Sequence, residues 1–248
     1  MAFEPAVRLA FQHIPMMLPI GDAPMIPIQA NILYRIFFIK AGKYGTAFTI
    51  DAEGLSYLVT AKHLFDETLP NQKVQVFREG RWESLSYTAI AFCRSNVDIA
   101  VLRLQQSLCP PDLPVELTTD GMVLGQDVYM LGFPHLMYEE SGAVLHNGYP
   151  LPLVKRGAAC NLGLGDPRVL YVDAMSSQGL SGGPVVFLPL GTTQGVRIAG
   201  VISGFRTERE PVFDADGEKT GAYVEVNTGL LRAYGIQHAI DLIGRISR

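Results

Sequence analysis

The chain has 248 residues, of which 48% are hydrophobic and 18% are charged. This balance is typical of a globular protein with a sizeable core and excludes an intrinsically disordered chain. Because the formal net charge is −4 and few Lys or Arg residues cluster, neither nucleic acid nor a charged membrane surface is expected as a partner.

Residues 1–30 are rich in Pro and Met and have no clean period. They are expected to form an irregular N-terminal arm with a helical turn near residues 7–12, lying on the surface or against a partner. They lack the basic start and unbroken apolar core of a signal peptide. No apolar run in the chain reaches the length needed to span a bilayer, so no membrane association is expected.

From Asn31 onward the chain consists of short runs rich in β-branched and aromatic residues, separated by turn signals. No segment with helical periodicity interrupts them, which predicts an all-β protein with antiparallel sheets. The predicted strands lie at residues 31–39, 45–50, 55–60, 74–77, 81–92, 98–104, 127–133, 168–174, 184–188, 196–203 and 221–226.

Three other segments complete the chain. The Pro-rich stretch 105–125 is expected to connect two halves of the β structure. The charged stretch 206–221 is interpreted as an exposed hairpin or loop, with a solvated surface as its simplest role. Helical texture returns after Asn227-Thr228, where a helical segment interrupted at Gly235 is expected.

The cysteines argue against disulfide and metal chemistry, since there are three and no two have CxxC spacing. Unpaired cysteines are typical of a reducing compartment, so we expect a cytoplasmic protein without metal or other cofactors. Cys160 has no basic neighbour and is expected to be buried and unreactive. Four histidines without companions at metal-ligand spacing are interpreted as structural: His13, His135, His146 and His238.

Three motifs carry the candidates for catalysis. His63 directly follows the predicted strand LSYLVT, Asp98 precedes an apolar strand, and Ser181 lies between glycines in GLSGGP (residues 179–184). Each residue alone is more often structural: a packed histidine, a turn or cap aspartate, a Gly-Ser turn. Together they supply the nucleophile, base and orienting acid that acyl transfer requires. The glycines allow an exposed hydroxyl beside free backbone N–H groups.

GLSGG also matches GxSxG, the nucleophile elbow of α/β-hydrolases. That elbow requires a helix after the serine and a histidine further downstream. Here Pro184 and a β-type run follow Ser181, and the only downstream histidine is His238, within the terminal helical segment. The sequence therefore disfavours the elbow.

The motifs TAKH, VDIAVLRL and GLSGGP, in this order in a β-rich chain, resemble trypsin-like serine peptidases of the chymotrypsin fold. The resemblance covers about residues 31–246. It implies that Ser181 is the nucleophile, His63 the general base and then acid, and Asp98 the orienting acid. It also implies an oxyanion hole formed by the N–H groups of Gly179 and Ser181.

The fold implied by the resemblance is two antiparallel six-stranded β-barrels with the site between them. The domain boundaries expected on this basis are an N-terminal arm (1–30), a first barrel with His63 and Asp98 (31–115), a second barrel with Ser181 (116–226) and a C-terminal helical segment (227–248). Together they form one peptidase domain.

Two departures from the secreted members concern activation. Those members have Asp before the serine, which pairs with a new N-terminus after cleavage, whereas here the residue is Leu180. Ile36 follows Arg35, but Phe37-Phe38 replaces the rest of the usual IVGG start. We therefore expect no maturation by that cleavage, as in the intracellular, bacterial and heat-shock members.

The resemblance also suggests a substrate pocket whose base is Met175 rather than an acid. A preference for an apolar or medium-sized residue before the cleaved bond is expected, although Asp173 is a nearby acid. The pocket residues implied are Met175, Ser203, Gly204, Gly221 and Tyr223.

The sequence thus predicts a serine endopeptidase that acts on protein or peptide substrates through an acyl-enzyme intermediate. The alternative is a binding or scaffold protein of the same fold, with a site that is latent or opened by a regulatory protein partner. An esterase using the same triad is a third reading.

Overall fold

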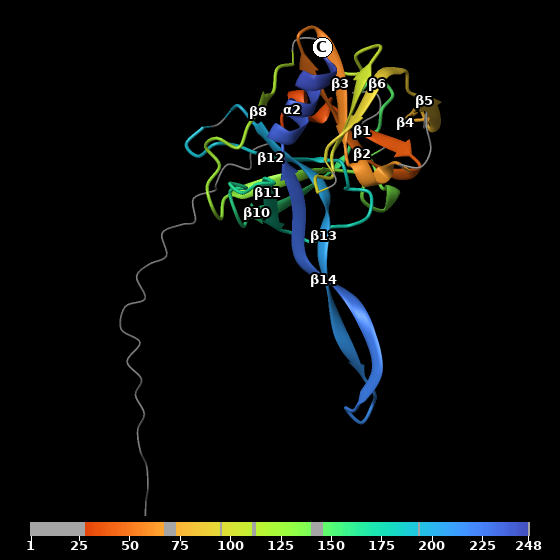
Figure 1. The fold of residues 1–248 in the computed structure, drawn as a ribbon, viewed down its shortest axis with the longest axis vertical. Coiled ribbons are helices and arrows are strands. Elements are labelled where there is room, and N and C mark those ends of the chain that lie inside the picture. Colours follow the sequence, from red (N-terminus) through yellow and green to blue (C-terminus); the bar gives the residue numbers. More distant parts are fainter. Residues whose placement is uncertain are drawn as a thin grey trace, which may run out of the picture.

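The computed structural model describes residues 28–66, 73–94, 96–110, 113–139, 146–192 and 194–247. The fold is nearly all β, with two sheets side by side and a C-terminal helix packed on them (Figure 1). Almost all of the expected N-terminal arm, including the helical turn near residues 7–12 and His13, lies outside the described residues.

The first sheet contains seven antiparallel strands in the order β5-β4-β1-β2-β3-β7-β6. Strands β2 and β3 form a hairpin in which residues 45–50 and 56–60 are buried. This burial is in keeping with their apolar and β-branched sequence. The strands are β1 (Ile36–Ala41), β2 (Lys43–Ala52), β3 (Leu55–Thr60), β4 (Gln75–Arg78), β5 (Arg81–Ser84), β6 (Tyr87–Phe92) and β7 (Ala100–Leu104).

The second sheet has the order β12-β9-β10-β11-β14-β13-β8, and an additional pairing of β12 with β13 closes six of its strands into a barrel. The short β8 joins β13 in parallel, outside this closed ring. The strands are β8 (Glu116–Leu117), β9 (Asp127–Gly132), β10 (Leu153–Ala159), β11 (Val169–Asp173), β12 (Pro184–Phe187), β13 (Arg197–Phe213) and β14 (Lys219–Gly235).

The expectation of an all-β fold with a C-terminal helix is confirmed, with one difference in the barrels. The second barrel closes, whereas in the described residues the first sheet stays open, because its end strands β5 and β6 do not pair with each other. No residue of either end strand is buried, so each strand carries a solvated face at the sheet edge.

The two sheets share one apolar core cluster, and each sheet also has a buried cluster of its own. Phe38 of β1 stacks on Phe133, which directly follows β9, with ring centroids 4.9 Å apart. The same buried cluster includes residues of β12, β13 and α2 (Gln237–Ile246). The sheets are therefore held at a fixed relative position, which the site between them requires.

Two element boundaries differ from the sequence prediction. Residues 30–33 form a short helix, α1 (Ala30–Leu33), so the first strand begins at Ile36 rather than at residue 31. The helix expected from residue 227 begins only at Gln237, because residues 227–235 continue β14. In that stretch Leu231 and Ala233 are buried while Arg232 is exposed, an alternation with the period of a strand.

The last two strands, β13 and β14, are 17 residues long and form a hairpin that projects far beyond the barrel (Figure 1). The charged stretch 206–221, predicted as a hairpin or loop, lies in it. No helix among the described residues is long and apolar enough to cross a membrane.

Candidate active site

The serine loop between β11 and β12 is compressed against the first sheet and the end of β9. Gly179 and Gly182 have φ angles of +96° and +85°, a region that side chains rarely adopt. A Cβ at Gly179 would lie 2.2 Å from the carbonyl oxygen of Phe133, and one at Gly182 would lie 2.1 Å from that of Thr46. Only glycine fits either position, which explains the spacing of the motif.

Thr46 of β2 fastens this loop to the first sheet. Its Oγ1 donates to the carbonyl oxygen of Gly179 at 2.7 Å and accepts from the N–H of Phe133 at 3.1 Å. Its own N–H donates to the carbonyl oxygen of Ser181 at 2.9 Å. Thr46 is fully buried, so these bonds are shielded from water. No motif in the sequence marks Thr46 as part of the site.

His63 and Asp98 meet because β3 and β7 are neighbours. Thr60 pairs with Ala100, so the turn after β3 and the residues before β7 lie at the same end of the sheet. His63 is in the 3-10 turn η1 (Lys62–Leu64), and its Nδ1 lies 2.6 Å from Asp98 Oδ2. The backbone N–H of His63 donates to Asp98 Oδ1 at 2.8 Å.

Ser203 of β13 connects the acid to the serine. Its Oγ donates to Asp98 Oδ2 at 2.6 Å, and its carbonyl oxygen accepts a 3.2 Å hydrogen bond from Ser181 Oγ. Within the described residues no hydrogen bond joins Ser181 to His63. The structure therefore brings the three candidates together around Ser203, with the hydroxyl of Ser181 turned to Ser203 rather than to the imidazole.

The environment of Asp98 favours its ionised form. Its burial alone raises the pKa, but hydrogen bonds from His63 and Ser203 outweigh that effect and hold the pKa of Asp98 below its usual range. The side chain of Asp98 is 17% exposed and that of His63 is 40% exposed. Asp98 is thus largely enclosed, while the His63 imidazole is accessible to solvent.

Several backbone N–H groups of the serine loop, those of Gly179 and Ser181 among them, have no hydrogen-bond partner among the described residues. The carbonyl oxygen of Gln178 accepts from the N–H of His135 at 2.8 Å. Because the C=O and N–H of a trans peptide point in opposite directions, the Gly179 N–H points away from His135. His135 and Leu136 have positive φ angles of 51° and 63°, so the segment that holds Gln178 is itself strained.

The predicted pocket residues do not all lie together. Met175 is 58% exposed beside Gly229, and a Cβ at Gly204 would meet no atom within 4 Å. The residues paired with Gly204 and Phe205 are Arg232 and Leu231.

Gly221 and Tyr223 lie elsewhere, because the hairpin is longer than the sequence spacing suggested. Tyr223 pairs with Pro211 far along the projecting hairpin and is 67% exposed. In their place Arg232, which the sequence analysis did not single out, approaches the site. Its Nη2 lies 3.4 Å from Ser203 Oγ.

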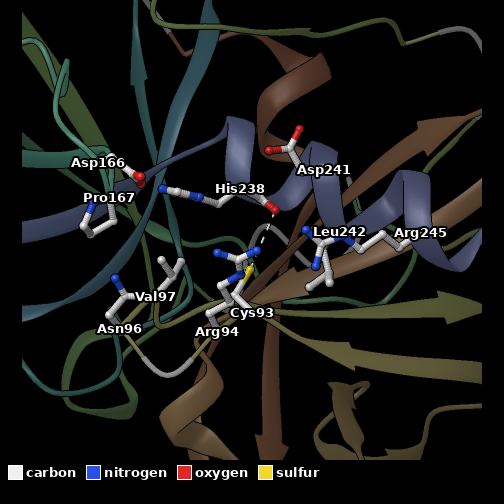
Figure 2. Close-up of a pocket in the computed structure, with 10 residues that line it drawn as sticks. All are labelled: Cys93, Arg94, Asn96, Val97, Asp166, Pro167, His238, Asp241, Leu242 and Arg245. Carbon is white, nitrogen blue, oxygen red and sulfur yellow. Dashed lines mark hydrogen bonds between the residues drawn. The ribbon is translucent and has the colours of Figure 1, made fainter.

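A separate cavity of about 330 Å³ lies between α2 and residues 93–97 and contains none of the three candidates (Figure 2). Cys93 there donates to the carbonyl oxygen of His238 at 3.7 Å, and burial raises the pKa of its thiol to about 11. His238 Nε2 accepts from the N–H of Arg168 at 3.2 Å, and burial lowers the pKa of His238. His238 is therefore engaged far from Ser181, contrary to what the hydrolase elbow requires.

The predictions for His146 and Cys160 have different outcomes. His146 is buried, its Nε2 donates to the carbonyl oxygen of Tyr34 at 3.0 Å, and its ring stacks on Tyr34, which fits a structural role. Cys160, expected to be buried, is exposed instead and directly follows the end of β10 at Ala159. No group of three His, Cys, Asp or Glu side chains suited to a metal occurs in the described part of the chain.

Comparison with known proteins agrees with this geometry. Residues 45–193 match the trypsin-like peptidase domain family, while no curated protein sequence matches the chain. The Rv3671c protease from M. tuberculosis, active form, has a TM-score of 0.55 and 18% identity over 98% of this chain and 93% of that one. The HtrA-type protease AlgW with a tripeptide has a TM-score of 0.54 and 20% identity over 87% and 61% of the two chains.

The serine endoprotease from Yersinia pestis has a TM-score of 0.55 and 17% identity, covering 87% of this chain and 63% of that one. At these identities the structures show a shared fold. The family match spans more than half of the chain and includes His63, Asp98 and Ser181. The chain therefore belongs to the trypsin-like peptidase domain family and is a serine protease.

Proposed function

We propose that the protein is a serine endopeptidase in which Ser181, His63 and Asp98 act as nucleophile, general base and orienting acid. The observation that carries this proposal is the hydrogen-bond network centred on Ser203, which joins the His63–Asp98 pair to the loop in which the N–H groups of Gly179 and Ser181 are unpaired. A nucleophile, an oriented base and oxyanion donors are the three parts that acyl transfer needs.

The proposed reaction has two halves. Ser181 Oγ attacks the carbonyl carbon of the scissile bond and its proton passes to His63 Nε2, while Asp98 holds the Nδ1–H. The N–H groups of Gly179 and Ser181 stabilise the oxyanion, and His63 then protonates the departing amine. Water, deprotonated by His63, hydrolyses the acyl-enzyme and restores the Ser181 hydroxyl. No cofactor enters any step.

Ser181 must first turn. Its hydroxyl donates to Ser203 in this structure, so attack requires rotation about the Cα–Cβ bond and loss of a 3.2 Å hydrogen bond. Such a neutral bond contributes only about 1 kcal/mol, so substrate contacts can supply the difference. The same observation favours the second candidate function, a latent site that a regulatory protein partner opens by fixing this rotation.

For specificity we propose an apolar or medium-sized residue before the cleaved bond. The exposed thioether of Met175 offers an apolar surface, and the open space beside Gly204 leaves room for a side chain. The solved AlgW structure holds a tripeptide, which makes a peptide ligand a reasonable choice for this chain as well.

A fluorophosphonate probe tests the function, because it forms a covalent adduct only with an activated serine. We expect labelling of the wild type and none of Ser181→Ala, with Ser177→Ala in the same loop as the matched control that keeps it. Casein and a p-nitrophenyl ester then separate an endopeptidase from an esterase. Absence of labelling in the wild type with and without candidate partners would support a binding protein instead.

We further propose a cytoplasmic location. The free thiols of Cys93, Cys109 and Cys160 suit a reducing compartment. Cell fractionation followed by immunoblotting tests it, and recovery of the protein outside the cytoplasm would contradict it.

A further inference from the structure

The part of the β13–β14 hairpin that projects from the barrel is here called the hairpin arm and comprises residues 206–228. In the barrel, β12 and β8 pair with β13 only as far as Val201, and β11 pairs with β14 only from Leu230 onward. Beyond these points the described residues place no strand on either side of the hairpin. The arm is thus a two-stranded ribbon with two open edges (Figure 1).

Such a ribbon is unusual in a monomer standing alone. Isolated two-stranded hairpins are marginally stable in water, and open edges invite the addition of another strand. The arm also exposes large apolar side chains in two pairs near its tip, where a solvated hairpin would carry polar ones. These are Val212 (37% exposed), Phe213 (53%), Tyr223 (67%) and Val224 (48%).

The arm begins at the active site. Ser203, whose carbonyl oxygen receives the Ser181 hydroxyl, lies on β13 only three residues before Arg206. β13 therefore runs from the serine nucleophile out along the arm, with register irregularities near residues 203, 206 and 212 and without an N–H at Pro211. A peptide that adds to the edge of β13 as an antiparallel strand next to Ser203 extends its N-terminal residues along the arm.

The charge of the arm identifies the chemistry of that peptide. Six carboxylates and three cations give residues 206–228 a net charge of −3. Glu208 and Glu210 lie on one face of β13, opposite Val226 and Val224 of β14. Glu208 has a weak contact with Arg206 at 3.9 Å, and Glu210 makes no ion pair within the described residues.

The other face of the arm is already neutralised, because Arg209 lies 3.4 Å from Glu225. A strand paired with β13 thus meets two carboxylates at alternate positions on one face only. Along an extended strand these lie about 17 Å and about 24 Å from Ser203, roughly five and seven residues away. A second copy of this chain is a poor occupant, since it would place two arms of the same negative charge together.

We propose that the hairpin arm is an extended docking edge for protein substrates that carry Lys or Arg at alternate positions, roughly five to eight residues before the cleaved bond. This inference rests on the proposed function, because it places the cleaved bond at Ser181. It adds a substrate class to that function: proteins with a basic, extended segment upstream of an apolar cleavage position.

Binding to Ser181→Ala tests the docking without turnover. Two fluorescein-labelled 14-residue peptides share an apolar C-terminal half and differ only in Lys or Gln at alternate positions of the N-terminal half. By fluorescence anisotropy at low salt, the Lys peptide should bind about five- to ten-fold more tightly, and the difference should shrink as salt is added. In the Glu208→Gln/Glu210→Gln background the preference should disappear.

The matched control is Asp216→Asn/Glu218→Gln, which removes the same charge at the tip of the same arm. If docking is local, this variant keeps the preference. Equal binding of the two peptides, or a preference that survives Glu208→Gln/Glu210→Gln, would overturn the proposal. If both double variants lose the preference for the Lys peptide equally, the proposal is also overturned. That result would mean that the overall negative charge of the arm attracts the peptide, without docking along β13.

Two further measurements separate the inference from the function on which it rests. If the probe labels Ser181 but the Lys and Gln peptides bind equally, the docking edge is wrong while the proposed peptidase function stands. If the Lys peptide is preferred but the probe does not label Ser181, the docking edge stands on a binding protein. Sedimentation velocity tests the remaining occupant: we expect a monomer. A dimer that Tyr223→Ser dissociates would overturn the proposal and assign the arm to a second copy.

Discussion

The hydroxyl of Ser203 and Oδ2 of Asp98 are joined by a 2.6 Å hydrogen bond, on the same oxygen that Nδ1 of His63 approaches. The other carboxylate oxygen accepts the backbone N–H of His63. Both oxygens of Asp98 are therefore occupied, and the carboxylate is fixed in one orientation. Ser203, predicted from the sequence only as a pocket residue, is in the structure a hydrogen-bond donor to Asp98.

Ser203→Ala should weaken catalysis without removing it. A hydrogen bond to a charged group contributes about 1.5–3 kcal/mol, so kcat/KM should fall on the order of ten- to a hundred-fold. The bond lowers the pKa of Asp98, so its loss should raise that pKa. Steady-state kinetics measure the fall in kcat/KM and NMR titration of the carboxyl follows its pKa, with Ser177→Ala as the control in which neither should change.

The same substitution should alter acid stability. Because the pKa of folded Asp98 is depressed, its contribution is present above the pKa of the unfolded state and is lost as pH falls through the folded pKa. Ser203→Ala raises the folded pKa toward the unfolded one, so the variant should lose less stability than the wild type as the pH falls. Urea unfolding across the acid range measures this, and identical pH dependence in both proteins would contradict it.

Thr46→Val should loosen the serine loop. It removes the partner of the Gly179 carbonyl and of the Phe133 N–H, both buried, at a cost of about 2–5 kcal/mol in unfolding free energy. The rate of fluorophosphonate labelling should fall as well, since the Gly179 N–H moves with its loop. Urea unfolding and labelling kinetics measure the two effects.

Thr49→Val is the matched control for Thr46. Thr49 lies on the same strand and is also fully buried, but its Oγ1 has no hydrogen-bond partner in the described part of the chain. Replacing that hydroxyl by a methyl group should be neutral or stabilising. If the two variants lose the same stability, the contacts of Thr46 are not what fastens the loop.

The fold class and the three candidate residues could be predicted because both are visible in short stretches of sequence. Strand alternation is visible within six residues, and His63, Asp98 and Ser181 each lie in a short motif. No short motif marks Thr46, since its partner Gly179 is 133 residues away. A contact of that range is decided by how two sheets pack.

The pocket prediction failed to place two residues for a related reason. Spacing along the chain put Gly221 and Tyr223 beside Gly204, but pairing register puts Arg232 there. The length of a hairpin depends on where its turn forms. Asp214 makes that turn by accepting the N–H groups of Asp216 and Glu218 on Oδ1. The sequence near this turn does not indicate how many residues of β13 and β14 pair with the other strands of the barrel.

Gly182→Ala should disrupt the serine loop. Its Cβ would lie 2.1 Å from a backbone oxygen that cannot move aside, in addition to the cost of a positive φ. We expect a loss of about 3 kcal/mol or more in unfolding free energy and no fluorophosphonate labelling. Gly191→Ala is the control, with a φ of +78° but no atom within 4 Å, and should cost only about 1–2 kcal/mol.

Leu180→Asp should destabilise the protein rather than create an activation switch. Leu180 is fully buried among apolar side chains of the second barrel. A carboxylate there has no cation to pair with in the described core, which costs about 3–5 kcal/mol. Thermal unfolding should show a much lower Tm for Leu180→Asp than for Leu180→Met, whose volume is nearly unchanged. Equal Tm values would imply a hidden cationic partner.

The last prediction concerns maturation: active protein should retain the Arg35–Ile36 bond. Arg35 is only 3% exposed, and its Nη1 binds Asp51 Oδ2 at 2.8 Å and the Thr49 carbonyl at 3.2 Å. Ile36 is fully buried and begins β1, paired with Phe48. A protease must draw several residues around a bond into its own cleft, which this packing prevents without unfolding the sheet. Mass spectrometry of the fluorophosphonate adduct should therefore find the bond intact, and added trypsin should cut after Arg35 only in denaturant. A labelled chain that begins at Ile36 would show that activation follows the route that Leu180 argues against.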